Sequence, residues 1–263
     1  SDYGYGGTFS VTGGTYTAVP ATNYIADGYK SVQSGDKYMV VKEDVGGVAT
    51  DNATLATAIQ NAQNGDTITI ALNAGEYVIP AAAQGKTIKF VGTGNPEDTK
   101  VAVTKVGSGG ENCDYGLDGS TVTFENITIT TNSSTYIGYA RCNGTYKNCI
   151  INGTYTLYGD SVFEDCTFNV SGDVYNIWTW GAPTATFTRC TFNCDGKAML
   201  LYGTENTKLT MNNCVFNDNG SISGKAAIEI GNDYNKSYEL TVNKATVNGF
   251  DINPNGFVTG TTL

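Results

Sequence analysis

Four acidic side chains lie near the ends of a recurring apolar segment and are the first candidates for chemistry: Asp160, Asp173, Asp195 and Glu229. Two carboxyl groups that meet in one groove can act as the acid and the base or nucleophile of glycoside cleavage. Asp160 and Asp195 are one such candidate pair. No DxD or other paired-carboxylate motif gathers the four, so we expect them to be solvated carboxylates in turns.

Other catalytic groups are scarce. The chain has no histidine, which removes the commonest general base and the commonest metal ligand. Its arginines are Arg141 and Arg189, and its seven cysteines show no CxxC spacing, so zinc is not expected. We therefore expect no metal, no cofactor and no assigned catalytic residue. Whether the chain is an enzyme stays open, with the sequence favouring a non-catalytic protein.

The composition points to many short strands. Hydrophobic residues make up 40% of the 263 residues and charged residues 15%, with 33 glycines and 5 prolines. Abundant glycine, threonine, asparagine and tyrosine are typical of an all-β protein with tight turns. The net charge of −10 and the scattered positive charges argue against nucleic acid as a partner. Without an apolar run near 18 residues, we expect no membrane insertion of this segment.

One phrase recurs along the chain: VTFENITIT at 122, GTYKNCIIN at 144, SVFEDCTFN at 161, ATFTRCTFN at 185, LTMNNCVFN at 209 and LTVNKATVN at 240. Its aligned apolar columns are Phe124, Tyr146, Phe163, Phe187, Met211 and Val242; then Ile127, Cys149, Cys166, Cys190, Cys214 and Ala245; then Ile129, Ile151, Phe168, Phe192, Phe216 and Val247. Alternation at period two indicates strands, and the step of three between the first two columns requires a corner. Repeats of roughly 22 residues predict a solenoid.

Two features of the phrase concern side-chain bonding. The corner residues are Asn126, Asn148, Asp165, Arg189, Asn213 and Lys244. Asn and Asp tolerate a left-handed bend and can bond from coil to coil, whereas arginine and lysine would interrupt such a ladder. The column cysteines are expected to be free buried thiols, because parallel side chains one coil apart fit a disulfide poorly.

The F-x-N-C-T-F phrase resembles that of pectin-lyase-like right-handed parallel β-helix proteins, over about residues 50–263. The expected fold is therefore all-β, a right-handed parallel β-helix over residues 49–263. A segment of helical spacing at 53–63 is similar to the N-terminal capping helix of such proteins. Residues 1–48 look like a β-rich segment that closes a preceding module in repetitive surface proteins of gut bacteria, or else form a small independent cap.

Each coil also carries a third segment that ends at glycine: TLYG at 156, WTWG at 178, LLYG at 200 and IEIG at 228. Alignment on glycine places Trp178 and Trp180 in one alternate set and Glu229 in the other. Since a charge is costly inside a core, Glu229 is predicted outside and both tryptophans inside. A slip of one residue in a single coil would instead expose the tryptophans as a platform for sugar rings.

With that alignment, the outward set is an apolar strip and a candidate partner-binding surface. It consists of Tyr155, Leu157, Ile177, Thr179, Met199, Leu201 and Glu229. Long loops that fold over the strip are the alternative explanation for its apolar character.

The resemblance also implies where an active site would lie. In pectate-lyase-like enzymes, acidic calcium ligands and an Arg or Lys base occupy the outer face of one sheet, and no such set is evident here. The leading hypothesis is a non-catalytic extracellular module, secreted or attached to the cell wall, of a larger bacterial protein: an adhesin, stalk or glycan-contacting domain. Its partners would be a glycan or a host or cell-surface protein, and other domains of the same longer chain. The alternatives are a polysaccharide lyase or glycoside hydrolase acting on acidic, plant or host glycans, and a phage tail fibre segment.

Overall fold

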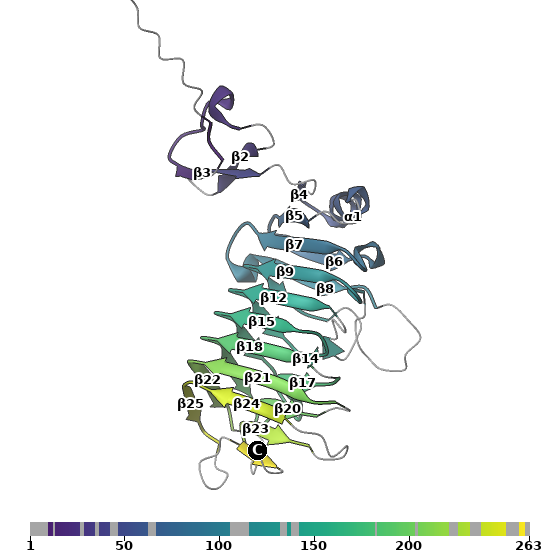
Figure 1. Cartoon of the computed structure of the whole chain (residues 1–263), viewed down its shortest axis with the longest axis vertical. Coiled ribbons are helices and arrows are strands. Elements are labelled where there is room, and N and C mark those ends of the chain that lie inside the picture. The colour runs from purple at the N-terminus through teal and green to yellow at the C-terminus, as the bar shows by residue number, and fades with distance from the viewer. Residues whose placement is uncertain are drawn as a thin grey trace, which may run out of the picture.

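A computed structural model describes most of the chain (Figure 1). The described residues are 10–12, 14–26, 29–34, 37–42, 47–62, 67–105, 116–131, 136–137, 142–181, 183–202, 205–220, 226–231, 238–250 and 258–260.

Three parallel sheets wind around one core, as predicted for a parallel β-helix. Sheet 1 contains β4 (Val48–Ala49), β5 (Thr67–Leu72), β7 (Thr87–Gly92), β9 (Thr121–Glu125), β12 (Asn143–Lys147), β15 (Ser161–Glu164), β18 (Thr184–Thr188), β21 (Thr207–Asn212) and β24 (Tyr238–Val242). Sheet 2 contains β6 (Gly75–Ile79), β8 (Thr99–Val103), β10 (Thr128–Ile129), β13 (Ile150–Asn152), β16 (Thr167–Asn169), β19 (Thr191–Cys194), β22 (Cys214–Asp218) and β25 (Ala245–Asn248). Sheet 3 contains β11 (Tyr136–Ile137), β14 (Thr154–Leu157), β17 (Ile177–Thr179), β20 (Met199–Leu201), β23 (Ile228–Ile230) and β26 (Val258–Gly260).

The phrase sets the register of the first two sheets. Tyr146 pairs with Phe163 and Phe163 with Phe187 in sheet 1, while Phe168 pairs with Phe192 in sheet 2. Their rings stack with centroid separations of 4.5, 4.9 and 4.8 Å, respectively. The aromatic columns predicted from the phrase are therefore confirmed as the buried core of the solenoid.

Five of the six predicted corner residues between sheets 1 and 2 adopt the left-handed backbone, and Lys244 does not. Positive φ angles occur at Asn126 (56°), Asn148 (49°), Asp165 (55°), Arg189 (53°) and Asn213 (60°). Asn148 Nδ2 donates to Asn126 Oδ1 over 2.8 Å. At Arg189 the amide ladder is interrupted as predicted, but Nε and Nη2 of this residue donate to the two carboxylate oxygens of Asp165 at 2.7 and 2.9 Å. An ion pair thus replaces the amide contact at that corner.

The capping helix is confirmed as α1 (Asn52–Asn61). Asp51 caps its start, because Thr54 N donates to Asp51 Oδ1 over 2.8 Å and Asp51 N donates back to Thr54 Oγ1 over 3.1 Å. Leu55 and Ile59 are fully buried. The helix therefore covers the apolar core at the N-terminal end of the solenoid (Figure 1).

Short 3₁₀ turns lie at η1 (Thr22–Tyr24), η2 (Ala81–Ala83) and η3 (Pro96–Asp98). The N-terminal segment forms a separate antiparallel sheet in the order β1 (Thr15–Tyr16), β3 (Lys37–Lys42), β2 (Tyr29–Ser34). The parallel ladder begins at Val48, where β4 pairs with β5. The role of residues 1–48 as the closing cap of a preceding module stays a prediction.

The described cysteines are free and buried: Cys142, Cys149, Cys166, Cys190, Cys194 and Cys214. The prediction of free thiols in the column is thus confirmed. Each column thiol donates to a main-chain carbonyl of the preceding coil, for example Cys149 Sγ to Phe124 O over 3.4 Å. Burial raises the pKa of the Cys142 thiol to about 12, which keeps it in its unreactive protonated form.

Because the column cysteines Cys149, Cys166, Cys190 and Cys214 are buried, we expect their thiols to resist alkylation in the native protein and to react after denaturation without reductant. Peptide mapping by mass spectrometry after iodoacetamide treatment, with and without denaturant, measures this for each residue. A peptide that contains Cys166 disulfide-linked to Cys190 would contradict the geometry of the column.

Candidate functional site: the outer face of sheet 3

The strip predicted on the outside of sheet 3 is wrong. The apolar members Tyr155, Leu157, Ile177, Met199 and Leu201 are at most 1% exposed and belong to the core. Thr179 is also fully buried. Only Glu229 keeps its predicted outward position, where it is half-buried.

Hydrogen bonds explain how the two hydroxyl groups of the strip, on Tyr155 and Thr179, are accommodated inside. The hydroxyl groups of Tyr155 and Tyr146 share a buried hydrogen bond of 2.6 Å. Thr179 Oγ1 donates to Tyr202 O and accepts from Tyr202 N, both over 2.9 Å. Because these hydroxyls are satisfied, their burial costs little.

The prediction failed because the IEIG strand pairs with its neighbour one residue away from the register that alignment on glycine gives. Leu200 pairs with Glu229, and Gly231 N donates to Leu201 O over 2.9 Å, which places Gly231 beside Tyr202. Glycine is therefore not a register marker in this sheet. Glu229 shares its row with Trp178, since Trp178 pairs with Leu200.

Both tryptophans consequently point outward, in contrast to the prediction that they lie in the core. Trp178 and Trp180 are half-buried and absent from the core cluster, while their neighbours Ile177 and Thr179 are fully buried. With Tyr136, Tyr158 and Tyr202, which are also half-buried, they define what we call the aromatic face. This face spans β11, β14, β17 and β20 and their ends.

The rings of the aromatic face contact one another. Trp178 makes edge contacts with Tyr136 and Tyr202, at centroid separations of 5.8 and 5.9 Å and interplanar angles of 87° and 66°. Trp180 and Tyr202 lie 5.5 Å apart at 30°. Neighbouring rings therefore stand in different orientations. The buried Trp178 Nε1 has no hydrogen-bond partner among the described residues.

A chain of polar contacts borders the aromatic face. The Tyr175 hydroxyl donates to Glu229, and Lys197 pairs with Asp173. Lys197 Nζ also lies 5.3 Å from the centroid of the Tyr175 ring. Burial, and next the hydrogen bond to the Glu229 carboxylate, raise the pKa of Tyr175 above its usual value. Each charge of this border is thus engaged within the protein.

The candidate catalytic carboxylates do not come together as a pair. Asp160 lies in the turn from sheet 3 to sheet 1, whereas Asp195 lies in the loop from sheet 2 to sheet 3, so the sheet 3 strands separate them. Asp160 Oδ1 accepts from Thr184 N over 2.9 Å, and Asp195 Oδ2 accepts from Gly172 N over 2.7 Å. Each carboxylate therefore accepts a main-chain hydrogen bond from a neighbouring coil. Arg189 is bound at its corner, and Arg141 lies outside the described residues.

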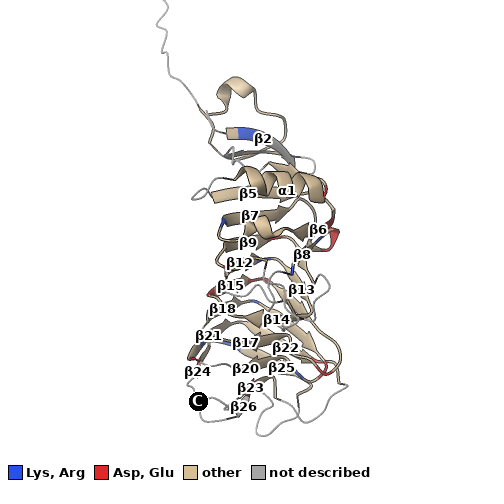
Figure 2. Ribbon diagram, turned by 90° about the vertical axis from the view of Figure 1, so that its right-hand side faces the viewer, with Lys and Arg blue, Asp and Glu red and all other residues tan. Residues whose placement is uncertain are grey.

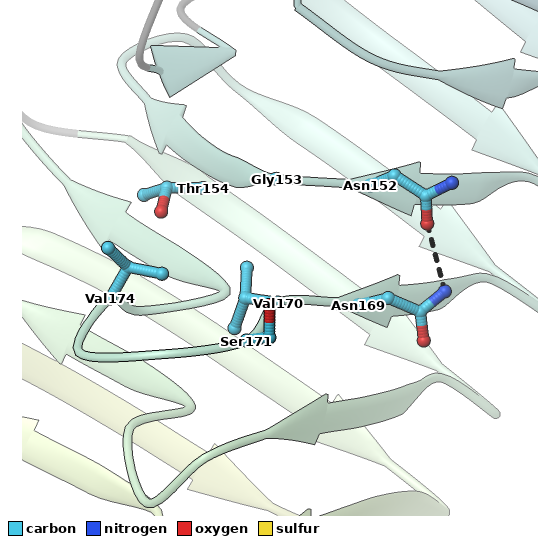
Figure 3. A pocket seen from close by; sticks show the side chains of 7 residues that line it. All are labelled: Asn152, Gly153, Thr154, Asn169, Val170, Ser171 and Val174. Atoms are coloured by element: carbon cyan, nitrogen blue, oxygen red, sulfur yellow. Dashed lines mark hydrogen bonds between the residues drawn. The ribbon is translucent and has the colours of Figure 1, made fainter.

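Sheet 2 carries a second ladder that was not predicted from the sequence. The asparagine that ends every phrase but the first lies on the outer face and bonds to the next coil: Asn152, Asn169, Asn193, Asn217 and Asn248, with amide separations of 2.8 to 3.0 Å. The first two border a shallow depression of about 470 Å³, also lined by Gly153, Thr154, Val170, Ser171 and Val174 (Figure 3). The recurring final asparagine was the signal available in the sequence.

The arrangement offers aromatic rings for contact with a ligand. Exposed aromatic surface stacks on the apolar faces of sugar rings, and the nearby carboxylates are already held by protein donors. Among the described residues, no group of three or more histidine, cysteine or acidic side chains could hold a metal ion. In the same part of the chain, no helix is both long enough and apolar enough to cross a bilayer.

Three parallel sheets around one ladder-like core define a solenoid of the parallel β-helix class. The family model described as right handed beta helix region matches residues 91–252, so the chain belongs to this family. No curated protein and no solved structure matches it.

Proposed function

We propose that the chain is a non-catalytic, extracellular glycan-contacting module of a larger bacterial surface protein. The observation that carries this proposal is the outward aromatic face around Trp178, Trp180 and Tyr202. If these rings served only the core, they would not need to face outward. Tryptophan and tyrosine side chains on a surface commonly contact ligands that are partly apolar and partly polar.

The surrounding charges support binding without catalysis. Glu229 accepts from Tyr175, and Asp173 pairs with Lys197. A carboxylate that catalyses glycoside cleavage needs a second carboxyl group at a fixed distance across the bond. The candidate partners Asp160 and Asp195 instead lie at opposite ends of the sheet 3 strands.

The distribution of charge also supports a partner that is not a nucleic acid. Lysine and arginine are scattered along the described coils (Figure 2), and several are paired with acidic residues, for example Lys89 with Glu125 at 2.8 Å. Phosphate backbones are bound by gathered positive charge. A chain with a net charge of −10 and half-buried aromatic rings on its outer face favours an uncharged ligand such as a polysaccharide.

Removal of either outward tryptophan is expected to abolish most of the glycan affinity. A glycan array first identifies the ligand, and titration calorimetry then compares the wild type with Trp178→Ala and Trp180→Ala. Loss of an aromatic anchor costs about 2 kcal/mol, which corresponds to an affinity about 30-fold lower. The free energy of unfolding should fall by only about 1–2 kcal/mol, because each ring is half-buried and its ring contacts are worth about that much.

Val162 provides the control. It is 44% exposed on the outer face of sheet 1, away from the aromatic face, so Val162→Ala should leave the glycan affinity unchanged. Glycan binding that survives both tryptophan substitutions would place the contact elsewhere. If Trp180→Ala lowered the free energy of unfolding by more than about 3 kcal/mol, the Trp180 ring would have to be a buried core residue.

A further inference from the structure

Two polar atoms beneath the aromatic face lack hydrogen-bond partners. Thr156 Oγ1 and Trp178 Nε1 are buried, and neither bonds with any described residue. Thr156 pairs with Trp178 between β14 and β17. The residues on either side of each in its strand are buried in the interior, so both side chains lie on the outer face of sheet 3. Thr156 is nevertheless only 5% exposed, so neighbouring groups cover it.

The rings of Trp178 and Tyr136 meet above β14, the strand that holds Thr156. Strand β14 lies between β11 and β17, so the strands that carry the two rings are about 9.6 Å apart. The ring centroids are only 5.8 Å apart. Both rings therefore lean over β14 toward each other, which accounts for the burial of a residue on an outer face.

Burial without a partner costs free energy for both groups. The same sheet shows how a hydroxyl group is satisfied, since Thr179 Oγ1 bonds with the main-chain nitrogen and oxygen of Tyr202. Valine has the shape of threonine and would carry no such cost at position 156. A pair of hydrogen-bonding groups that the described chain does not satisfy indicates a partner from outside it.

The two atoms together select the chemistry of that partner. An indole N–H only donates and a hydroxyl can donate, so one acceptor oxygen, of a carbonyl or a carboxylate, can receive both bonds. A carboxylate is disfavoured, because Glu229 follows Trp178 and Leu200 in the same row of sheet 3 and the net charge is −10. An amide carbonyl is neutral, and the methyl group of an acetamide can pack against the rings of Trp178 and Tyr136.

A site for the rest of the sugar adjoins this pair. Thr154 lies two residues before Thr156 on the same face, pairs with Tyr136, and lines the depression of about 470 Å³ (Figure 3). Asn152 and Asn169 lie at the other end of the depression (Figure 3). Asn152 is exposed there, so its amide can reach a sugar hydroxyl. The depression therefore leads from exposed amides to the aromatic face.

We propose that the module binds glycans that carry N-acetyl groups, and that one acetamido carbonyl oxygen accepts hydrogen bonds from Trp178 Nε1 and Thr156 Oγ1. This inference rests on the proposed glycan-contacting function and adds the class of sugar. The sugar ring would lie over the depression and Trp178. Because both atoms are closed to solvent, the Trp178 ring has to tilt to admit the acetamido group. Binding should therefore change the environment of Trp178.

Tetramers of β-1,4-linked N-acetylglucosamine and of β-1,4-linked glucose test this, because they differ only in the group at C2 of each sugar. Tryptophan fluorescence reports binding, since the two tryptophans of the chain are Trp178 and Trp180. We expect the acetylated tetramer to bind at least about 10-fold more tightly, in line with two additional hydrogen bonds. Equal affinities overturn this inference and leave the proposed function intact.

If neither tetramer binds, the glycan array decides. Acetylated glycans among the bound set support the inference, and a bound set without them overturns it while the proposed function stands. An array with no bound glycan overturns both.

Two conservative variants test the two atoms. Thr156→Val removes the hydroxyl and keeps the shape of the side chain, and Trp178→Phe removes the indole N–H and keeps an aromatic ring. We expect each to weaken binding of the acetylated tetramer about 5-fold and to leave binding of the glucose tetramer unchanged. Thr156→Val should leave the free energy of unfolding unchanged or raise it, because a buried unpaired hydroxyl is lost.

Thr186→Val is the matched control. Thr186 lies on the outer face of sheet 1 between Val162 and Thr210, so its replacement should change neither affinity. Full affinity for the acetylated tetramer in both Thr156→Val and Trp178→Phe would mean that the two atoms bind water only, and it overturns the inference. A free energy of unfolding that is lower in Thr156→Val than in the wild type also overturns it, since the hydroxyl would then be bonded within the protein.

Discussion

Substitution of Phe163 by alanine is expected to lower the free energy of unfolding by about 3–5 kcal/mol. The Phe163 ring is fully buried and stacks between Tyr146 and Phe187, with centroid separations of 4.5 and 4.9 Å and interplanar angles of 10° and 3°. Removal of the ring leaves a cavity in a column whose neighbours are held by their own strands and cannot move in to fill it. Chemical denaturation followed by circular dichroism measures the loss.

The neighbouring residue supplies the control for this substitution. Val162 is next in sequence but lies on the opposite face of β15, where it is 44% exposed. Val162→Ala should change the unfolding free energy by no more than about 0.5 kcal/mol. Similar losses for the two substitutions would mean that the inside and outside of β15 have been exchanged.

Gly159→Ala is expected to be destabilising by about 3 kcal/mol or more, because no space exists for a methyl group. A Cβ atom at this position would overlap the carbonyl oxygen of Cys142 and lie 2.7 Å from its carbonyl carbon. Both atoms belong to the main chain of the preceding coil, so relief requires a shift of a whole coil. Thermal and urea unfolding of the variant measure the effect.

Gly172→Ala separates this clash from the general cost of replacing glycine. No atom lies within 4 Å of a Cβ built on Gly172, and its φ of 77° costs alanine about 1–2 kcal/mol. Gly159→Ala should therefore be clearly the less stable of the two variants. The reverse order would show that the turn after β14 has more room than the structure gives it.

The core of sheets 1 and 2 was predictable because the recurring phrase determines the register of both sheets at once. Each phrase holds a strand, a corner and a second strand, so the positions of Phe163 and Phe168 are constrained together. A slip in one strand would misplace the other. The phrases identify equivalent residues even where the coils differ in length. Tyr146 pairs with Phe163 across a short coil, and Met211 pairs with Val242 across a long one.

No repeated phrase determines the register of sheet 3. The prediction therefore placed its inward-facing residues outside and its outward-facing residues inside. Its strands are three or four residues long at β14, β17, β20 and β23, and variable loops precede each of them. Alignment then depended on a single glycine per coil. Glu229 does point outward, as the cost of burying a charge predicts, but the residues aligned with it in the prediction were one position off.

The asparagine ladder of sheet 2 was missed for a different reason. Coil-to-coil hydrogen bonding was predicted only for the corner residues, and not for the asparagine that ends every phrase but the first. Asn193 donates to Asn169 over 2.8 Å and accepts from Asn217 over 2.9 Å. A polar residue that recurs at one position in a solenoid indicates such coil-to-coil bonding as directly as an apolar column indicates a core.

The direction of these bonds determines how the solenoid would respond to mechanical tension. Strand-to-strand hydrogen bonds and the asparagine ladder both run from coil to coil, along the long axis. A force that pulls the two ends apart therefore loads the bonds of one coil at a time instead of shearing many together. The coils would peel off in sequence from an end, each lengthening the chain by its own roughly 22 residues. Extension under load would thus be stepwise, with the inner coils intact until the outer ones have opened.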